Sequence, residues 1–124
     1  MRAPRTRLVF VRHGQTDYNR EGRLQGQVDI PLNATGVRQA ESLAPTITAD
    51  PPDVIVASPL ERARETARLI SSGTDVEITT DVAFLERSFG RWEGLKGEEI
   101  RSRWPEEHAD WRAHRPVSGL DVED

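Results

Sequence analysis

Apolar residues along the chain fall into short runs separated by polar segments that contain glycine and proline. The run 8–11, Leu-Val-Phe-Val, is continuous and β-prone, which predicts a strand buried on both faces of a parallel sheet. Two further β-prone runs, 53–57 and 76–80, predict a second and a third strand.

Segments with helical periodicity alternate with these strands. The first follows Thr35, a candidate N-cap, and has Pro45 as a kink or early end; its apolar positions are Val37, Ala40, Leu43, Ala44 and Ile47. The second begins at Ser58-Pro59-Leu60-Glu61, which has capping-box spacing, and Gly73 is expected to end it in the left-handed conformation. Its apolar stripe consists of Leu60, Ala63, Ala67 and Ile70. This alternation predicts an α/β fold with a mainly parallel sheet.

The remaining segments are less regular. Residues 15–33 are polar and interrupted by glycine and proline, which predicts a long loop of the kind that is often functional. Past Phe84 we expect irregular chain, then two short helices at 98–103 and 105–112. Their expected buried positions are Ile100, Trp104 and Trp111. Residues 115–124 form a polar, acidic end with no closing strand.

Composition limits the possible classes of protein. With 124 residues and 35% hydrophobic content, the chain has the size of a single domain, residues 1–124, with one core. A net charge of -4 argues against nucleic acid as a partner. The absence of cysteine rules out disulfides and thiolate metal sites and fits a reducing compartment. The apolar run 8–11 is too short for a signal-peptide core or a membrane span, so we expect a cytoplasmic protein that does not enter membranes.

Candidate chemistry gathers where the predicted strands end. Arg12, His13 and Gly14 follow the first strand, and ligands of open parallel sheets bind outside the carboxyl ends of the strands. Arg62 falls near the start of the helix after the second strand, at a terminus that favours anions. The two arginines could clamp one phosphate, and Gly14 would let the backbone come close to it.

A phosphate held beside His13 suggests nucleophilic catalysis through a phosphohistidine, because an imidazole with a pKa of about 6.5 is largely neutral at pH 7. The leaving alkoxide needs a proton, and Glu86, just after the third strand, is the best candidate for that acid. Spacing alone does not separate Glu86 from Glu93. A lone histidine after a strand is more often structural than catalytic, and an arginine at a helix start is more often solvated or salt-bridged. The hypothesis of a catalytic site therefore depends on the histidine, the arginines and the carboxylate occurring together.

Longer motifs resemble a known family. The string from Arg12 to Asn19 matches an RHGxTxxN motif, and it is followed in order by SPLxRAxxTA from Ser58 to Ala67 and LExxFGxWEG from Leu85 to Gly94. These motifs are similar to those of the histidine phosphatase superfamily, the phosphoglycerate mutase-like group. The resemblance implies a three-layer α/β fold with a mainly parallel sheet.

The resemblance also implies roles for individual residues. His13 would be the phosphorylated nucleophile, and Glu86 would be the proton donor and later the base for water. The residues that would bind the phosphoryl group or line the substrate side of the pocket are Arg12, Gly14, Asn19, Gln25, Gly26 and Arg62. Glu93 would hold the turn around Gly94. No metal and no cofactor are implied, because the arginines supply the positive charge.

The sequence departs from the family pattern at its C-terminal end. The family continues to another strand that ends in a second His-Gly pair, and this is absent here. His108 and His114 stand in polar helical contexts and are interpreted as surface or packing residues. We therefore interpret the chain as the N-terminal part of the family fold, with an incomplete sheet that could pair with a second copy in a homodimer.

Three functions remain open at this stage. The first is a phosphatase that hydrolyses a small phosphorylated metabolite. The second is a phosphoglycerate mutase, which the short stretch before Trp104 disfavours. The third is a phosphate-binding remnant without catalysis, which the missing second histidine suggests.

Overall fold

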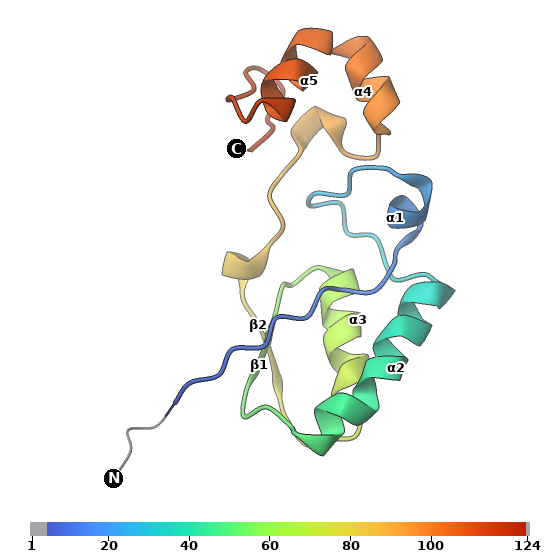
Figure 1. Cartoon of the computed structure of the whole chain (residues 1–124), viewed down its shortest axis with the longest axis vertical. Coiled ribbons are helices and arrows are strands. Elements are labelled where there is room, and N and C mark those ends of the chain that lie inside the picture. The colour runs from blue at the N-terminus through green and yellow to red at the C-terminus, as the bar shows by residue number, and fades with distance from the viewer. Residues whose placement is uncertain (1–4, 124) are drawn as a thin grey trace.

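The computed structural model describes residues 5–123, in which helices alternate with short strands (Figure 1). In chain order the elements are α1 (Asp17–Glu21), α2 (Ala34–Ala49), β1 (Ile55–Ala57), α3 (Glu61–Ile70), β2 (Ile78–Thr80), the 3-10 turns η1 (Val82–Phe84) and η2 (Gly90–Trp92), α4 (Gly97–Arg103) and α5 (Pro105–Arg112). No helix among residues 5–123 combines the length and the apolar character needed to cross a bilayer.

The sheet consists of β1 and β2 paired in parallel, with Ile55 opposite Ile78 and Ala57 opposite Thr80. The chain crosses between the two strands through α3, which contacts both of them and also packs against α2. Ala67 and Ile70 of the predicted α3 stripe are buried, because this face of the helix meets those neighbours. The predicted α/β fold with a parallel sheet is confirmed.

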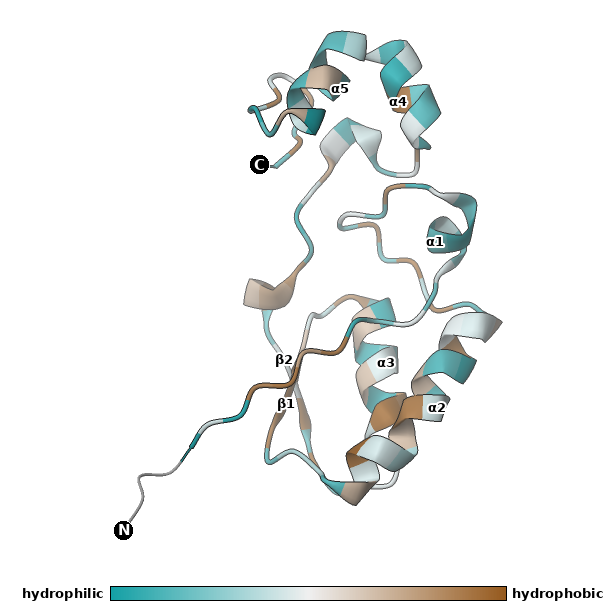
Figure 2. Cartoon of the chain, viewed as in Figure 1, coloured by the Kyte–Doolittle hydropathy of each residue, from teal (hydrophilic) through white to brown (hydrophobic). Residues whose placement is uncertain are grey.

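The predicted strand at 8–11 is wrong in this structure. The segment is extended, but its backbone makes no hydrogen bond to the backbone of any other residue within 5–123, and Leu8, Val9 and Phe10 are 73%, 64% and 87% exposed. A strand buried on both faces needs a hydrogen-bonded neighbour and a covering layer on each side. The described sheet supplies neither, so residues 8–11 form an exposed, extended apolar segment, called the apolar ribbon below (Figure 2).

The predicted loop 15–33 contains a one-turn helix, α1. Thr16 forms a capping box with Asn19: the Thr16 hydroxyl accepts the Asn19 N–H at 3.2 Å, and Asn19 Oδ1 accepts the Thr16 N–H at 3.0 Å. Gly22 ends α1 in the left-handed conformation with a φ of 72°. A helix of five residues is too short to show a periodic pattern of apolar positions, so the hydrophobic pattern does not predict α1.

The ends of α2 differ from the prediction. Asn33 rather than Thr35 is its N-cap, with Oδ1 accepting the Gly36 N–H at 2.9 Å. Pro45 lies inside α2 without ending it, and the helix continues to Ala49.

The ends of α3 differ as well. Ser58 Oγ accepts the N–H of Leu60, and the helix begins only at Glu61, so no capping box forms. Gly73 does not cap the helix, which ends at Ile70 with Ser71 at a φ of -100°. Gly73 serves a different purpose: a Cβ there would lie 2.5 Å from Thr48 Oγ1 of α2, so its lack of a side chain allows close packing.

A second apolar cluster lies at the C-terminal end of the described chain, away from the sheet (Figure 1). Its buried members are Phe89, Trp92, Ile100, Leu120 and Val122. The two predicted short helices are confirmed as α4 and α5, and Ile100 is buried as expected, whereas Trp104 and Trp111 are half-buried at the edge of the cluster. This cluster anchors the chain that follows Glu86.

Candidate active site

His13 is half-buried and is separated from the exposed apolar segment 8–11 by Arg12 alone. Its Nδ1 lies 2.7 Å from the carbonyl oxygen of Gly14. A carbonyl can only accept a hydrogen bond, so this contact places the proton on Nδ1 and leaves the lone pair on Nε2. The local backbone therefore leaves Nε2 as the ring nitrogen that can act as a base or a nucleophile.

Gly14, the residue after His13, attaches this part of the chain to α3 and packs closely against the start of α2. Its N–H donates to Thr66 Oγ1 at 3.1 Å, and the same hydroxyl donates to the Arg62 carbonyl at 2.7 Å. A Cβ on Gly14 would lie 2.5 Å from the carbonyl oxygen of Gly36 at the start of α2, so only glycine fits. Thr66 was not singled out from the sequence, although it is the threonine of the SPLxRAxxTA motif.

Arg62 is a buried cation in the first turn of α3, only 2% exposed. Its guanidinium donates to the carbonyls of Gly26 at 2.5 Å and Val28 at 2.7 Å. A guanidinium has five N–H donors, so three remain for a ligand. The carbonyls of loop 25–28 thus hold Arg62 in place while leaving part of its donor fork for an anion.

The amino end of α3 is not a free anion site, contrary to expectation. Asp29 Oδ1 accepts the N–H of Glu61 at 2.7 Å, so a carboxylate from the preceding loop already occupies the first amide of the helix. An anion near α3 would therefore have to be held by the Arg62 side chain rather than by the first amide of the helix.

Burial, helped by two nearby arginines, favours the neutral form of His13. Burial lowers the pKa of His13 most strongly, and Arg62 and Arg12 lower it further, while the hydrogen bond to Gly14 and the charge of Glu86 raise it. The net direction is downward from about 6.5. Burial also lowers the pKa of Arg62, and Glu86 is the first of the carboxylates that oppose this effect. The structure thus brings Arg12, Arg62 and Glu86 within electrostatic reach of His13.

Glu86 and Arg12 are both exposed. Glu86 lies between η1 and η2, where its Oε1 accepts the N–H of Arg87 at 3.0 Å and its carbonyl accepts Gln27 Nε2 at 3.1 Å. An exposed carboxyl group at this position can exchange protons with a leaving group and with water.

Asn19 and Gln25 are turned toward the cap of α1. Asn19 Oδ1 serves the capping box, and the Thr16 hydroxyl contacts Gln25 Oε1. The amide nitrogens of both side chains have no protein partner among residues 5–123 and are available as donors. Their contact with a phosphoryl group stays a prediction.

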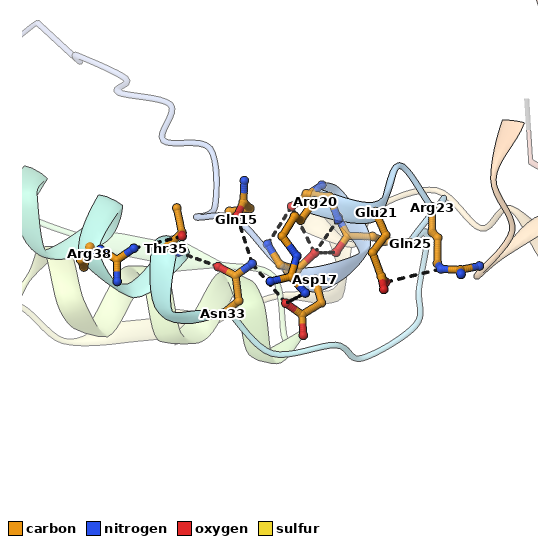
Figure 3. Close-up of polar contacts among 12 residues, drawn as sticks. Gln15, Asp17, Arg20, Glu21, Arg23, Gln25, Asn33, Thr35 and Arg38 are labelled. Atoms are coloured by element: carbon orange, nitrogen blue, oxygen red, sulfur yellow. Dashed lines mark hydrogen bonds and ion pairs between the residues drawn. The ribbon is translucent and has the colours of Figure 1, made fainter.

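Asn33 ties this loop to the rest of the site (Figure 3). Its Nδ2 donates to Gln15 Oε1 at 3.1 Å and to Asp17 Oδ1 at 3.3 Å, while its Oδ1 caps α2. One side chain therefore joins the residue two positions after His13, α1 and the start of α2. Asn33 was not identified from the sequence as part of the site.

The other two histidines stand apart from this arrangement. His108 is half-buried in α5, where the centroid of its ring lies 6.4 Å from that of Trp92 and 6.1 Å from that of Trp111. His114 is exposed. Both placements agree with their interpretation as packing or surface residues. Within residues 5–123, no group of three or more histidine, cysteine or carboxylate side chains is arranged to hold a metal ion.

Comparison with known proteins gives consistent relatives. The chain is 43% identical over 101 residues to the uncharacterized phosphatase PhoE of Bacillus subtilis, a match that covers 82% of this chain and 52% of the relative. It is 38% identical over 123 residues to glucosyl-3-phosphoglycerate phosphatase of Mycobacterium tuberculosis, covering 94% of this chain and 55% of that protein. The chain therefore spans about half the length of the curated relatives it matches.

Solved structures agree with this relationship. The alpha-ribazole phosphatase of Shigella flexneri superimposes with a TM-score of 0.81 at 30% identity, over 91% of this chain and 56% of that chain. A mycobacterial glucosyl-3-phosphoglycerate phosphatase complexed with VO3 superimposes with a TM-score of 0.75 at 37% identity, over 81% of this chain and 48% of the other. The family model of the histidine phosphatase superfamily (branch 1) matches residues 8–123. Together with the arrangement around His13, these matches show that the chain belongs to the histidine phosphatase superfamily.

Proposed function

We propose that this protein hydrolyses a small phosphomonoester through a phosphohistidine on His13. The observation that carries the proposal is the state of that side chain: its Nδ1 is held by Gly14 at 2.7 Å, which leaves the Nε2 lone pair available beside the buried cation of Arg62. A neutral, oriented imidazole next to an anion-binding guanidinium is suited to attack phosphorus.

The first half of the reaction transfers the phosphoryl group to the enzyme. The remaining donors of Arg62, with Arg12, hold the phosphoryl oxygens. Nε2 of His13 attacks phosphorus, the bond from phosphorus to the ester oxygen breaks, and Glu86 gives its proton to that oxygen, so an alcohol leaves.

The second half restores the enzyme. Glu86, now ionised, takes a proton from water, and the hydroxide oxygen attacks the phosphohistidine. The bond from nitrogen to phosphorus breaks, inorganic phosphate leaves, and His13 is neutral again.

The remaining ligand assignments are part of this proposal. Asn19 and Gln25 would add donors through their free amide nitrogens, while Gly14 and Gly26 would let the backbone approach the ligand. The partner would be a small phosphorylated metabolite, with no nucleic acid and no membrane. We propose that residues 1–124 act as one domain and that the protein is cytoplasmic, which the lack of cysteine supports.

The names of the relatives favour hydrolysis over transfer of the phosphoryl group back to a substrate. Several are phosphatases, acting on glucosyl-3-phosphoglycerate, phosphoserine or alpha-ribazole phosphate by name, and one from Gloeobacter violaceus is a phosphoglycerate mutase at 36% identity. Mutase activity and a phosphate-binding remnant are therefore the two alternatives that an experiment must separate from hydrolysis.

The decisive experiment traps the intermediate. The chain is mixed with radiolabelled phosphomonoester, quenched, and tested for phosphate that is labile to acid and stable to base. We expect such label on the wild-type protein and none on His13→Ala, with p-nitrophenyl phosphate turnover lost in the same variant. Label on a serine or a carboxylate would refute the assignment.

Two further outcomes identify the alternatives. Transfer of label to 3-phosphoglycerate without release of inorganic phosphate would identify a mutase. Phosphate binding with neither label nor turnover at any pH would identify a non-catalytic remnant.

A further inference from the structure

Glu93 joins two segments of the site that lie far apart in the sequence. It follows η2 directly, and its Oε1 accepts the backbone N–H of Gln27 at 3.0 Å and that of Phe89 at 3.0 Å. A carboxylate that accepts two backbone N–H groups makes charge-assisted hydrogen bonds, which are stronger than those between neutral groups.

The first of these segments controls Arg62. Gln27 stands between Gly26 and Val28, whose carbonyls accept the two hydrogen bonds from the Arg62 guanidinium. A shift of the Gln27 backbone would therefore displace both acceptors. The charge of Glu93 also acts on Arg62, since it is one of the carboxylates that oppose the lowering of the Arg62 pKa by burial.

The second segment controls Glu86. Phe89 lies three residues after Glu86, and the side chain of Gln27 donates back to the Glu86 carbonyl at 3.1 Å. Gln27, which shares the Glu93 oxygen with Phe89, thus adjoins the two carbonyls that hold Arg62 and bonds through its side chain to the backbone of Glu86.

The two segments approach each other as closely as glycine permits. Gly26 has a φ of 52°, and a Cβ on it would collide with the Glu93 carboxylate and lie 3.0 Å from the Phe89 nitrogen. Backbone bonds fix the neighbouring chain, with the Gly94 N–H donating to the Leu24 carbonyl at 2.7 Å. The Glu93 carboxylate, on a half-buried residue, therefore lies in a tight junction between the two segments.

We propose that Glu93 is a positioning residue that sets the separation between Arg62 and Glu86. It acts through backbone N–H groups and does not touch the substrate. The role rests on the proposed function, in which Arg62 holds the phosphoryl group while Glu86 protonates the leaving oxygen. Without Glu93, loop 25–28 and segment 86–89 would lose their common acceptor, and the acid would no longer be aligned with the bound ester.

The test compares Glu93→Ala with Glu93→Gln, which keeps an acceptor oxygen and removes the charge. Turnover is measured with p-nitrophenyl phosphate, whose leaving group needs little protonation, and with an alkyl phosphate, whose leaving group needs a full proton. For Glu93→Ala we expect kcat on the alkyl phosphate to fall at least about ten times more than kcat on p-nitrophenyl phosphate, and Glu93→Gln to restore most of the loss. Glu99→Ala is the matched control, because Glu99 Oε1 also accepts a backbone N–H, that of Lys96 at the N-cap of α4, at 3.2 Å.

Exchange of the Gln27 and Phe89 amide protons provides a readout that does not require turnover. Both should exchange faster in Glu93→Ala than in wild type and Glu93→Gln, and the Kd for inorganic phosphate should rise in Glu93→Ala alone. Equal losses on both substrates, unchanged exchange, or a Glu93→Gln variant as impaired as Glu93→Ala would overturn the proposal. If the wild-type chain shows no turnover, the proposed function fails, and amide exchange with phosphate affinity then decides whether Glu93 positions the anion site.

Discussion

The backbone N–H of Gly14 donates to the side-chain hydroxyl of Thr66 at 3.1 Å, and this bond anchors the residue after His13 to the middle of α3. Residues 8–13 make no backbone hydrogen bond to the rest of residues 5–123. The orientation of the proposed nucleophile therefore depends on the short stretch that begins at Gly14, and one buried threonine, Thr66, provides the contact of that stretch with α3.

Replacing Thr66 with valine should misplace His13. Valine keeps the shape of threonine but leaves the buried Gly14 N–H without an acceptor, at a cost of about 1–3 kcal/mol. We expect kcat with p-nitrophenyl phosphate to fall by about tenfold or more, since about 1.4 kcal/mol corresponds to tenfold in rate. Thr66→Ser keeps the hydroxyl and should retain most of the activity. A Thr66→Val enzyme as active as wild type would show that this bond does not hold the nucleophile.

Replacing Arg62 with methionine should affect both stability and catalysis. The carbonyls of Gly26 and Val28 lose their donors, which costs about 1–3 kcal/mol for each carbonyl left buried without a partner. Loss of the phosphoryl clamp should lower kcat/KM by about 10² to 10³. Arg68→Met is the matched control, because Arg68 is exposed and pairs with Glu65 on the same helix. Steady-state kinetics and denaturant unfolding of both variants give the comparison, and equal effects would contradict a special role for Arg62.

The lowered pKa of His13 predicts how activity depends on pH. Burial, with the charges of Arg62 and Arg12, keeps the imidazole neutral below its ordinary pKa of about 6.5. The acid limb of the kcat/KM profile, measured with p-nitrophenyl phosphate, should therefore lie below about pH 6.5. Arg12→Met removes one of the charges and should move that limb toward higher pH. A limb that stays in place would show that Arg12 lies outside electrostatic reach.

The same pKa shift affects stability with a definite sign. Because the folded protein binds the His13 proton less tightly than the unfolded chain does, unfolding takes up protons as the pH falls. The contribution of His13 to the free energy of unfolding is therefore fully present above about pH 6.5 and is lost as the pH falls through the lowered, folded-state pKa. As the pH falls through this range, the free energy of unfolding of the wild type should decrease relative to that of His13→Gln. A difference that does not vary with pH would contradict the shift.

The sequence was sufficient where chemistry and local pattern coincide. His13, Arg62 and Glu86 were singled out together because each belongs to a family motif and stands beside a predicted strand end or helix start, although the strand before His13 does not form among residues 5–123. The helix α3 showed a clear apolar stripe. Residues that act through backbone geometry were missed. Thr66, Asn33 and Asp29 form hydrogen bonds to segments between 18 and 52 residues away, and no local period marks such contacts.

The run 8–11 shows the opposite failure. Its β-branched and aromatic residues favour an extended backbone, and the segment is extended. A strand also needs a neighbouring strand to pair with, and residues 5–123 provide none for it. Likewise Leu120 and Val122 lie in a stretch that reads as polar, yet they are 6% and 8% exposed because they meet Trp92 and Ile100 in the second cluster. Both errors arise from tertiary contacts that a window of sequence does not contain.

The exposed apolar side chains predict self-association. The large ones among residues 5–123 come from the N-terminal segment, from β1 and its approach, and from η1, and they are Leu8, Val9, Phe10, Val11, Val54, Val56, Val82 and Phe84. The last four of these residues lie in β1, directly before it, or in η1 after β2, and the first four form an extended segment whose backbone N–H and C=O groups are unpaired within residues 5–123 (Figure 1). An unpaired edge of this kind is a template for pairing with another strand, and two identical segments can satisfy each other around a twofold axis.

We propose that a second copy of this chain occupies that edge, and the test is the oligomeric state in solution. Sedimentation velocity over a range of protein concentrations should show a monomer in equilibrium with a dimer. Phe10→Asp places a charge in the centre of the ribbon, where the side chain is 87% exposed, and should weaken the dimer at least about tenfold, because burying an unpaired carboxylate costs several kcal/mol. Ala113→Asp adds the same charge at the exposed end of α5 and should leave the equilibrium unchanged. A wild-type chain that sediments as a monomer at every concentration would refute this use of the apolar ribbon.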